Sequence, residues 1–235
     1  YKQEWDELTR RIGYWVDLDQ PYVTFENNYI ESVWWLIKQI YENGQLYKGH
    51  KIQWYSPGTG TVLSSHEVSL GYKEVVDPSV FIRFKSSTDP HTSYLAWTTT
   101  PWTLPANTAL AVGEDIEYVC VSTFNAYTHQ PIRVVLAKPL VAKYFKEKDA
   151  EVVWEDYTPG DKQIPWRIVG QCMGHDLVSL RYQQLMPYVT PARNADQAFQ
   201  VIAGDFVSTE DGTGIVHIAP TFGADDARVA SAAGV

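Results

Sequence analysis

The sequence is short of cysteine and has no long hydrophobic run. Only two of its 235 residues are cysteine, Cys120 and Cys172, and they stand too far apart to form a Cys-x-x-Cys pair. This argues against a zinc site and against a disulfide framework, so we expect reduced, buried thiols in a cytoplasmic protein. No stretch is apolar for long enough to span a bilayer, and we expect no contact with a membrane.

Positive charge is also scarce. The chain has 19 Lys and Arg residues against 28 Asp and Glu, which gives a formal net charge of −9. It therefore lacks the overall positive field that attracts a nucleic-acid backbone. Any contact with nucleic acid is expected to be local, or to come from another part of a longer protein. The sequence starts without Met and stops at AAGV, so we expect an excised piece of a longer chain that is monomeric by itself.

The sequence does contain a helical start. Apolar residues recur at helical spacing between Ile30 and Tyr41, after Asn27 or Asn28 as the cap, and Asn43-Gly44 ends the pattern. We therefore expect residues 1–49 to form a helical lead-in whose apolar stripe faces a core. Residues 50–76 follow as a short hairpin connector, with strands near 52–55 and 61–63 around the turn SPGTG.

From residue 77 to 235 the pattern is one of many short strands with turns between them. We expect strands at 80–85, 93–99, 108–112, 117–122, 133–137, 152–154, 168–172, 199–203 and 214–218, and one helical insert at 139–148. Short strands in such number favour a closed or partly closed barrel, because closure removes exposed sheet edges. The predicted fold class is mixed and mainly β: a β-barrel domain with a few helices, preceded by the helical lead-in.

One candidate site segment is DGTGIVHIAPTFGADD, residues 211–226. Gly212, Thr213 and Gly214 form a tight turn before a short strand, in which His217 is the one polar residue. Pro220 ends the strand, and Asp225 and Asp226 stand at the start of a helix-forming stretch. Loop geometry could aim the histidine and a carboxylate at one ligand.

A second segment, YLAWTTTPWTLPANTALAV at 94–112, would supply the other wall of this site. A buried strand runs into Thr98, Thr99 and Thr100, and Pro101 ends it. A stiff loop with Trp102 and Thr103 follows, and Asn107 begins the next element. Threonine carries a hydroxyl on a β-branched side chain with few rotamers. A cluster of threonines beside prolines would therefore line a small cavity rigidly.

Each of these features also has a structural explanation. Threonine is common in strands and turns, Asp226 alone is most often a helix cap, and His217 alone is most often a satisfied core histidine. Their combination is more informative. TTTPWTLPAN and DGTGIVHIAPTFGADD together resemble the two signature segments of the editing domain of isoleucyl-tRNA synthetase, which is inserted in the catalytic domain of class I synthetases.

The resemblance covers nearly the whole chain. GHDLVSLRYQQLMPY at 174–188, VIAGDFV at 201–207 and the stretch 14–68 are also similar to that family. The residue Trp102 favours the isoleucine type, since valine and leucine types usually have an acidic residue there. One departure is the WYSP sequence at 54–57, where many relatives have a Trp-Cys-Pro zinc knuckle, so we expect no metal in this chain.

The resemblance implies hydrolysis of the ester in Val-tRNA(Ile), the task of an aminoacyl-tRNA deacylase. A hydrophobic pocket gains only about 1–3 kcal/mol from one methylene, an established magnitude for which this same synthetase is the usual example. A second site that admits valyl and excludes isoleucyl esters corrects the resulting errors. The implied partners are the 3′ end of mischarged tRNA(Ile) and the rest of the synthetase chain. No cofactor is expected here, and ATP and magnesium would serve the synthetic site of the parent enzyme.

The resemblance also implies roles for the two segments. Asp226, with or without Asp225, would bind the α-ammonium group of the amino acid. His217, Thr103 and Trp102 would bound the side-chain pocket, and Thr98, Thr99, Thr100 and Asn107 would position the ribose and a water molecule. Backbone amides of Gly212, Thr213 and Gly214 would receive an oxyanion or a phosphate. No Ser-His-Asp or Cys-His set is evident, so we expect no covalent intermediate.

Three other interpretations stay open. The chain could be an editing domain of the valine or leucine type, which acts on other mischarged tRNAs. It could be a non-catalytic β-barrel that binds an amino compound or the 3′ end of tRNA, with Asp226 as a cap. A carbohydrate-binding module is a weaker alternative, because only the number of aromatic residues favours it.

Overall fold

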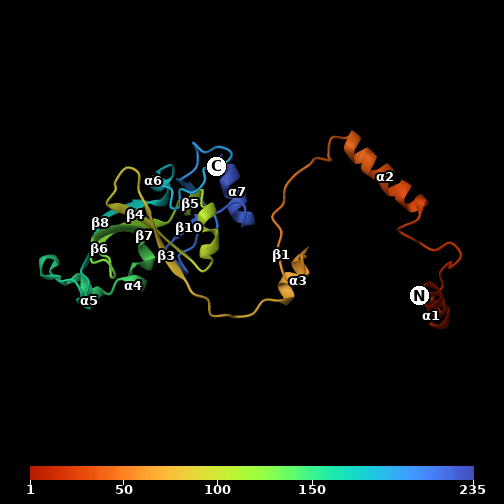
Figure 1. The fold of residues 1–235 in the computed structure, drawn as a ribbon, viewed down its shortest axis with the longest axis horizontal. Helices are drawn as coiled ribbons and strands as arrows, with labels where there is room; N and C mark the ends of the chain where they lie inside the picture. Colours follow the sequence, from red (N-terminus) through yellow and green to blue (C-terminus); the bar gives the residue numbers. More distant parts are fainter. The chain divides into compact units, whose positions relative to one another are not determined.

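Helices supply the regular structure of the first 50 residues, and strands supply most of it in the rest. The computed structural model describes residues 1–235, which divide into one unit from Tyr1 to His50 and another from Lys51 to Val235. Figure 1 shows the elements in chain order by colour. None of the helices combines the length and the hydrophobicity that a bilayer-spanning segment requires.

The first unit contains α1 (Lys2–Arg11) and α2 (Asn27–Glu42). The second helix confirms the one predicted from apolar spacing, and Gly44, with a φ of 70°, follows its end. Its N-cap is Glu26 and not one of the two asparagines. The apolar stripe does not form a core face, since α2 has no buried residue. A unit that runs from Tyr1 to His50 is close to the lower size limit at which a domain can build a core of its own.

The second unit starts with the predicted hairpin, formed by β1 (Tyr55–Ser56) and β2 (Thr61–Val62) in antiparallel pairing. A helix that we did not predict, α3 (Ser65–Leu70), follows directly. Ser64 and Glu67 cap it reciprocally, each side chain bonding the backbone N–H of the other residue. The spacing Ser-x-x-Glu is a known helix-start signal and could have identified this helix.

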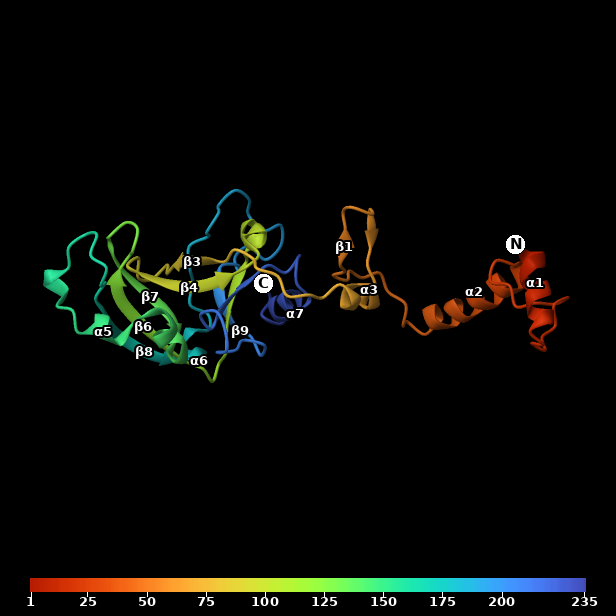
Figure 2. The ribbon, with the colours of Figure 1, turned by 90° about the horizontal axis from the view of Figure 1, so that it is seen from below.

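A five-stranded sheet forms one wall of the main body, with the order β3-β4-β7-β6-β8 (Figure 2). Its neighbours are antiparallel except for β4 and β7, which are parallel. The strands confirm the predicted positions to within a few residues: β3 (Val80–Lys85), β4 (Thr92–Thr98), β6 (Glu117–Phe124), β7 (Pro131–Ala137) and β8 (Trp166–Met173).

A three-stranded sheet forms the other wall, in the order β10-β5-β9. It consists of β5 (Ala109–Val112), β9 (Gln200–Ala203) and β10 (Ile215–Ile218), and the helix α7 (Ala224–Ala232) packs on it. The residues of β5 alternate in size. Ala109 and Ala111 face Val229 and Ala230 of α7, whereas Leu110 and Val112 face the main core. Small residues on one face let the helix approach the sheet closely.

The main core lies between the two sheets. Phe84, Tyr94 and Tyr118 come from the five-stranded sheet, and Leu110 and Ile215 come from the three-stranded sheet; all five are nearly or fully buried. A second cluster covers the opposite face of the five-stranded sheet, around Val121 and Leu136. The larger sheet is therefore packed on both faces, which agrees with the near-continuous apolar runs in β6 and β7.

The predicted barrel is not confirmed, because the sheets stay open. Isolated bridges from Ser86 to Tyr182 and from Arg181 to Gln200 connect β3 with β9, but β8 and β10 remain at the ends of their sheets. A barrel requires the first and last strands to pair. The last strand, β10, has only four residues, and Pro220 lies two positions after its end. The fold is therefore mixed α/β with several open sheets.

Two predicted elements are wrong in detail. The helix expected at 139–148 is divided into η2 (Lys138–Leu140), α4 (Val141–Tyr144) and α5 (Glu147–Ala150). The break occurs at Phe145, whose backbone is extended and whose ring packs on Trp166, with ring centroids 5.4 Å apart. Tertiary packing thus overrides helical spacing here.

The strand expected at 152–154 is absent, and the short helix η3 (Trp154–Asp156) begins at its last residue. The Trp154 ring lies 4.4 Å from the ring of Phe124, centroid to centroid, which holds this segment by side-chain packing. Two more short helices were not predicted, η1 (Pro101–Ala106) and α6 (Gly174–Leu177).

The turn before β10 tests how closely the two sheets are packed. Gly214 has a φ of 74°, and a Cβ added to it would lie 2.4 Å from Cβ of Ala137 in β7. Gly160 also has a positive φ, 103°, but lies in open space. We expect Gly160→Ala to cost about 1 kcal/mol of unfolding free energy, and Gly214→Ala about 1–3 kcal/mol more through overpacking. Urea unfolding measures both, and equal losses would contradict the close packing.

Candidate functional site

Predicted site residues meet around a small pocket of about 210 Å³, which we call the His217 pocket. Three parts of the chain form it: the end of β4, the helix η1, and the segment that runs from β10 into α7. The residues that line it are Trp97, Thr98, Thr100, Thr103, Val216, His217, Ala219, Phe222, Gly223 and Asp226. Pockets for drug-sized ligands usually measure about 300–1,000 Å³, so this one suits a smaller group.

Strand pairing explains why these segments meet. The chain leaves β4, turns through η1 and enters β5, which pairs antiparallel with β10 and sets His217 opposite Leu110. The Thr108 N–H donates to the carbonyl of Ile218 and extends this pairing toward η1. Two segments more than 100 residues apart in sequence are thereby placed at one end of the smaller sheet.

The threonines form a rigid cluster. The hydroxyls of Thr98 and Thr100 are 3.2 Å apart, and the Thr100 N–H donates to Oγ1 of Thr98 over 3.0 Å. The Thr103 hydroxyl donates to the carbonyl of Thr100 over 3.1 Å. Thr99 follows the end of β4 and does not line the pocket. Only three of the four predicted threonines therefore surround the cavity.

His217 is buried and bonded at both ring nitrogens. Its Nε2 lies 2.9 Å from Oγ1 of Thr103, and its Nδ1 lies 2.9 Å from Nδ2 of Asn107. The Asn107 amide also donates to the carbonyl of Ala109 over 2.9 Å. Asn107 was expected to touch the ligand. It is instead buried behind the imidazole and orients it.

Tyr182 completes this network, and sequence reasoning missed it. Its hydroxyl donates to Oδ1 of Asn107 over 2.6 Å, and its side chain is buried. Because Oδ1 is occupied, Nδ2 faces His217, and Nδ1 of the imidazole has to accept. The proton of a neutral imidazole is then on Nε2, which donates to Thr103, and Thr103 donates to Thr100. Every hydrogen bond in the series from Tyr182 to Thr100 therefore runs in the same direction.

The charge state of His217 agrees with this arrangement. Burial lowers the pKa of His217, and the nearby Asp226 carboxylate opposes part of that shift. A protonated ring would need to donate from Nδ1 toward an amide that itself donates. The imidazole is therefore neutral near pH 7, and both its nitrogens are engaged by the protein.

Asp226 is the one carboxylate in the pocket. Its Oδ1 accepts the Ala219 N–H over 2.8 Å, while Oδ2 accepts no hydrogen bond from the protein. The backbone of Gly223 lies close by: a Cβ at that position would be 2.1 Å from Oδ2. One oxygen is thus held in place and the other is free for a charged hydrogen bond. Gly223 leaves room for the carboxylate in this position, and a side chain at 223 would displace it.

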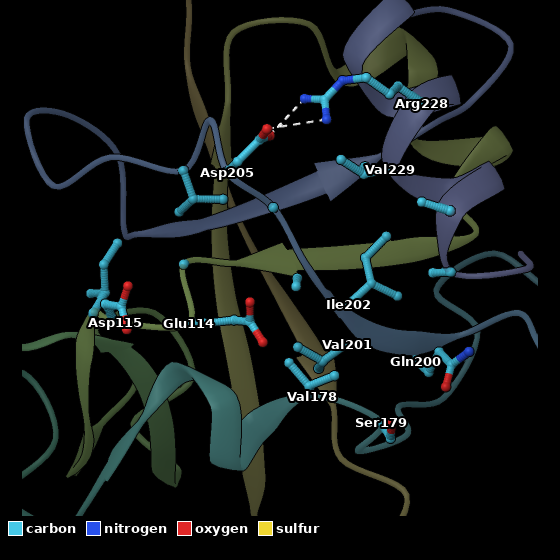
Figure 3. A pocket seen from close by; sticks show the side chains of 17 residues that line it. Glu114, Asp115, Val178, Ser179, Gln200, Val201, Ile202, Asp205, Arg228 and Val229 are labelled. Atoms are coloured by element: carbon cyan, nitrogen blue, oxygen red, sulfur yellow. Dashed lines mark hydrogen bonds and ion pairs between the residues drawn. The ribbon is translucent and has the colours of Figure 1, made fainter.

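Asp225 lies elsewhere. Its carboxylate is 3.3 Å from Arg228, whose guanidinium also binds Asp205 with two hydrogen bonds of 2.6 and 3.1 Å. Figure 3 shows the pair of Arg228 and Asp205 beside a wider hollow of about 760 Å³. This hollow has an apolar floor that includes Val201 and Ile202, and it contains no predicted site residue. The predicted site residues therefore gather at the smaller His217 pocket and not at this larger hollow.

Two further expectations are not met by the geometry. The turn at 212–214 is buried and does not line the pocket. Its carbonyls accept from Tyr144, from the Ala137 N–H at 2.8 Å and from Tyr118 at 2.6 Å, so the turn ties the two sheets together. Trp102 is 76% exposed and does not form the pocket floor.

Several lining residues were not predicted. Trp97 and Val216 come from the strands, and Ala219, Phe222 and Gly223 from the loop before α7. The two-residue period of β4 gave no signal for Trp97, because it places Trp97 and Thr98 on opposite faces of the strand, whereas both line the pocket where β4 ends. The loop residues gave no signal either. His217 and Asp226 are the only metal-ligating side chains in the pocket.

Comparison with known proteins places this chain in a family. The family model described as tRNA synthetases class I (I, L, M and V) matches residues 1–209. The chain is 61% identical over 241 residues to the isoleucine–tRNA ligase of Cytophaga hutchinsonii, which covers 100% of this chain and 21% of that protein. It is 54% identical over 244 residues to that of Bacteroides fragilis, with coverage of 100% and 21%. The chain spans about a fifth of the length of these curated relatives.

Solved structures show a weaker likeness. The crystal structure of GlLeuRS-CP1 is 15% identical, with a TM-score of 0.44, and the match covers 67% of this chain and 63% of that one. The editing domain of the P. falciparum cytosolic leucyl-tRNA synthetase is 14% identical, with a TM-score of 0.41 and coverage of 58% and 44%. At such TM-scores no residue roles are carried over.

The lowered pKa of His217 predicts a stability change with pH. In the unfolded chain the imidazole titrates near its ordinary pKa of about 6.5. Below that pH the unfolded state binds a proton that the folded state does not, so stability falls as pH decreases from about 6.5 toward the lowered folded pKa. Urea unfolding between pH 7.5 and 5 should show a smaller loss for His217→Gln than for the parent chain. His91→Gln, at an exposed site, should keep the parent profile.

Removing the Tyr182 hydroxyl tests the network. Tyr182→Phe leaves Oδ1 of the buried Asn107 without its donor, and we expect a cost of about 1–3 kcal/mol in unfolding free energy. The amide can then reorient, so the imidazole ¹⁵N chemical shifts of His217 should move from the Nε2–H form toward a mixture. Tyr188→Phe, at an exposed site, should change neither quantity. Unchanged shifts in Tyr182→Phe would show that Asn107 orients the ring alone.

Proposed function

This chain belongs to the class I tRNA synthetases for isoleucine, leucine, methionine and valine, and we propose that it is the editing part of an isoleucine–tRNA ligase. In this proposal it hydrolyses the ester of Val-tRNA(Ile) after transfer. The observation that carries the proposal is the meeting of Asp226, a neutral His217 and three threonine hydroxyls around one small pocket.

Asp226 would bind the α-ammonium group of the misattached amino acid. Its free Oδ2 supports this role, because a carboxylate and an ammonium form a strong charge-assisted hydrogen bond. Oδ1 is held by the Ala219 N–H, so the free oxygen has a defined direction. An amino acid anchored at this oxygen would extend its side chain along the wall of Trp97, Val216 and His217.

That wall would set the size limit. The indole, the branched valine and an imidazole bonded at both nitrogens have little freedom to move. Binding alone separates two side chains that differ by a methylene by only about 1–3 kcal/mol. Exclusion from a stiff pocket can be stronger, because an oversized group forces strained rotamers or backbone shifts. A valyl group would fit, and an isoleucyl group would overlap the wall.

Hydrolysis would use a positioned water molecule. The water oxygen attacks the ester carbonyl carbon, and the ribose oxygen leaves with a proton. The hydroxyls of Thr98 and Thr100 lie close enough together to hold such a water. His217 is not the general base in this scheme, because Nδ1 and Nε2 are both engaged. The neighbouring ribose hydroxyl can assist an ester that is already activated, and the reaction calls on no cofactor bound by this chain.

A binding module without turnover is the second candidate function. The isoleucine relatives, similar to this chain over its whole length, favour the isoleucine type over the valine and leucine types. This similarity does not distinguish a chain that hydrolyses the ester from one that only binds it. The His217 pocket would serve either purpose, since both need the ammonium anchor and the size limit.

The matched aspartates give the test. We expect Asp226→Ala to lower deacylation of preformed Val-tRNA(Ile) about 10- to 100-fold, through loss of one charge-assisted hydrogen bond. Asp225→Ala removes the same charge one residue away, but from the pair with Arg228, and should leave the rate nearly unchanged. The assay uses both the 235-residue chain and a full-length isoleucine–tRNA ligase that carries it.

The outcomes separate the candidate functions. Selective release of valine and not isoleucine by the parent protein, lost in Asp226→Ala, supports editing and the anchor. Binding of Val-tRNA(Ile) without release of valine supports the binding module. Equal losses in the two alanine variants would overturn the assignment of Asp226 as the anchor.

A further inference from the structure

A second hollow of about 440 Å³ lies over the face of the five-stranded sheet near the turn between β6 and β7. We call it the aromatic groove. It is lined by residues of β3, of α4 and α5, and of the turn and the segment before β8. The side chains that define it are Phe81, Arg83, Tyr127, Tyr144, Lys146 and Lys162.

The groove presents aromatic rings at both ends. Phe81 and Tyr144 pack edge to face with ring centroids 5.2 Å apart, and Phe81 is still 47% exposed. At the other end, Tyr127 is 91% exposed, and Phe124, which also lines the groove, stacks on Tyr157 with ring centroids 4.4 Å apart. Exposed rings offer flat surfaces on which further rings can stack.

The groove also carries positive charge on an acidic chain. Arg83, Lys146 and Lys162 are exposed and line the groove, and none of the three takes part in an ion pair. Asp149 is the only acidic residue in the lining. The local charge is therefore positive although the whole chain has a net charge of −9. An anionic occupant would neutralise these cations.

The groove continues toward the His217 pocket. Phe81 of β3 lies directly opposite Trp97 of β4, so the two rings stand on the same face of the sheet. Tyr144 donates a hydrogen bond to the carbonyl of Gly212, and the Trp97 ring lies against Gly212. Phe81 and Tyr144 line the groove, whereas Trp97 lines the pocket. The two hollows are thus joined through a chain of direct contacts.

We propose that the aromatic groove binds single-stranded RNA, namely the unpaired segment that precedes the terminal nucleotide in the His217 pocket. The rings would stack on bases, and the three cations would bind phosphates. This combination is the usual basis of single-strand binding without sequence preference. The inference rests on the proposed function for the identity of the strand, but the binding of RNA in the groove can be measured without it.

The charge of the groove favours RNA over an apolar peptide. A peptide held by the rings alone would leave Arg83, Lys146 and Lys162 without partners. A phosphate backbone matches several separated cations at once and makes the affinity depend on salt. The salt dependence of binding therefore distinguishes the two occupants.

The test compares two double variants with the same change in charge. Lys146→Gln with Lys162→Gln removes two cations from the groove. Lys85→Gln with Lys148→Gln removes two exposed lysines of β3 and α5 that do not line it and form no ion pair. Fluorescence anisotropy with a labelled single-stranded RNA of 12 nucleotides measures the affinity of the 235-residue chain, with salt varied from about 50 to 200 mM.

We expect the groove variant to bind the RNA at least about threefold more weakly at the lowest salt, and the control variant to bind like the parent. The slope of log affinity against log salt should decrease by about 1.4 in the groove variant, since each phosphate contact on a single strand contributes about 0.7. Phe81→Ala should weaken binding with little change in slope. Equal losses in both double variants, or binding that does not respond to salt, would overturn the proposal.

A short substrate separates this proposal from the proposed function. Valyl-adenosine has the ester but no preceding nucleotides, so the groove variant should hydrolyse it at the parent rate while its KM for Val-tRNA(Ile) rises. Asp226→Ala should lose hydrolysis of both substrates and keep the affinity for the RNA. If neither ester is hydrolysed by the parent chain or by the full-length ligase, editing fails while the RNA affinity still decides the groove. An unchanged KM for Val-tRNA(Ile) in the groove variant would overturn the groove as part of the substrate path.

Discussion

A buried imidazole needs a partner for each of its nitrogens, and most of the candidate site follows from that need. His217 obtains its partners from Thr103, which lies in the short helix η1, and from Asn107, which follows the end of that helix. Tyr182, which donates to the side-chain carbonyl of Asn107, and the Ala109 carbonyl, which accepts from its amide, orient Asn107 for this contact. The network therefore depends on three distant segments, and it holds the pocket wall in one position with one pattern of protons.

Local contacts also explain why Asp226 faces the His217 pocket and the adjacent Asp225 does not. Asp226 lies at the pocket because the Ala219 N–H holds one of its oxygens and because Gly223 leaves room for the other. Asp225, one position earlier on α7, points to Arg228 and the far side of the helix. Neighbouring residues on a helix are about 100° apart around its axis, so only one of the two can face the cavity.

The turn at 212–214 contacts side chains that line both the His217 pocket and the aromatic groove. Its three carbonyls bind residues of the five-stranded sheet and of α4, and it lies against Trp97. The open sheets are therefore held together at this point by hydrogen bonds and not by a closed ladder. A ligand that contacts Phe81 or Tyr144 on one side and Trp97 on the other would lie along the same continuous surface.

The sequence by itself determined most strands, the helix α2 and the two segments that form the pocket, because periodicity and turn residues act locally. The tertiary structure decided the rest. Barrel closure depends on which strands pair at a distance, and the break at Phe145 depends on the ring of Trp166. The sequence motifs predicted that Trp102, Thr99 and the turn at 212–214 would contact the ligand. None of them lines the His217 pocket, since Trp102 is exposed and the turn is buried between the two sheets. Tyr182 lies far from both motifs in sequence, and only the packing of the two sheets brings its hydroxyl to Asn107.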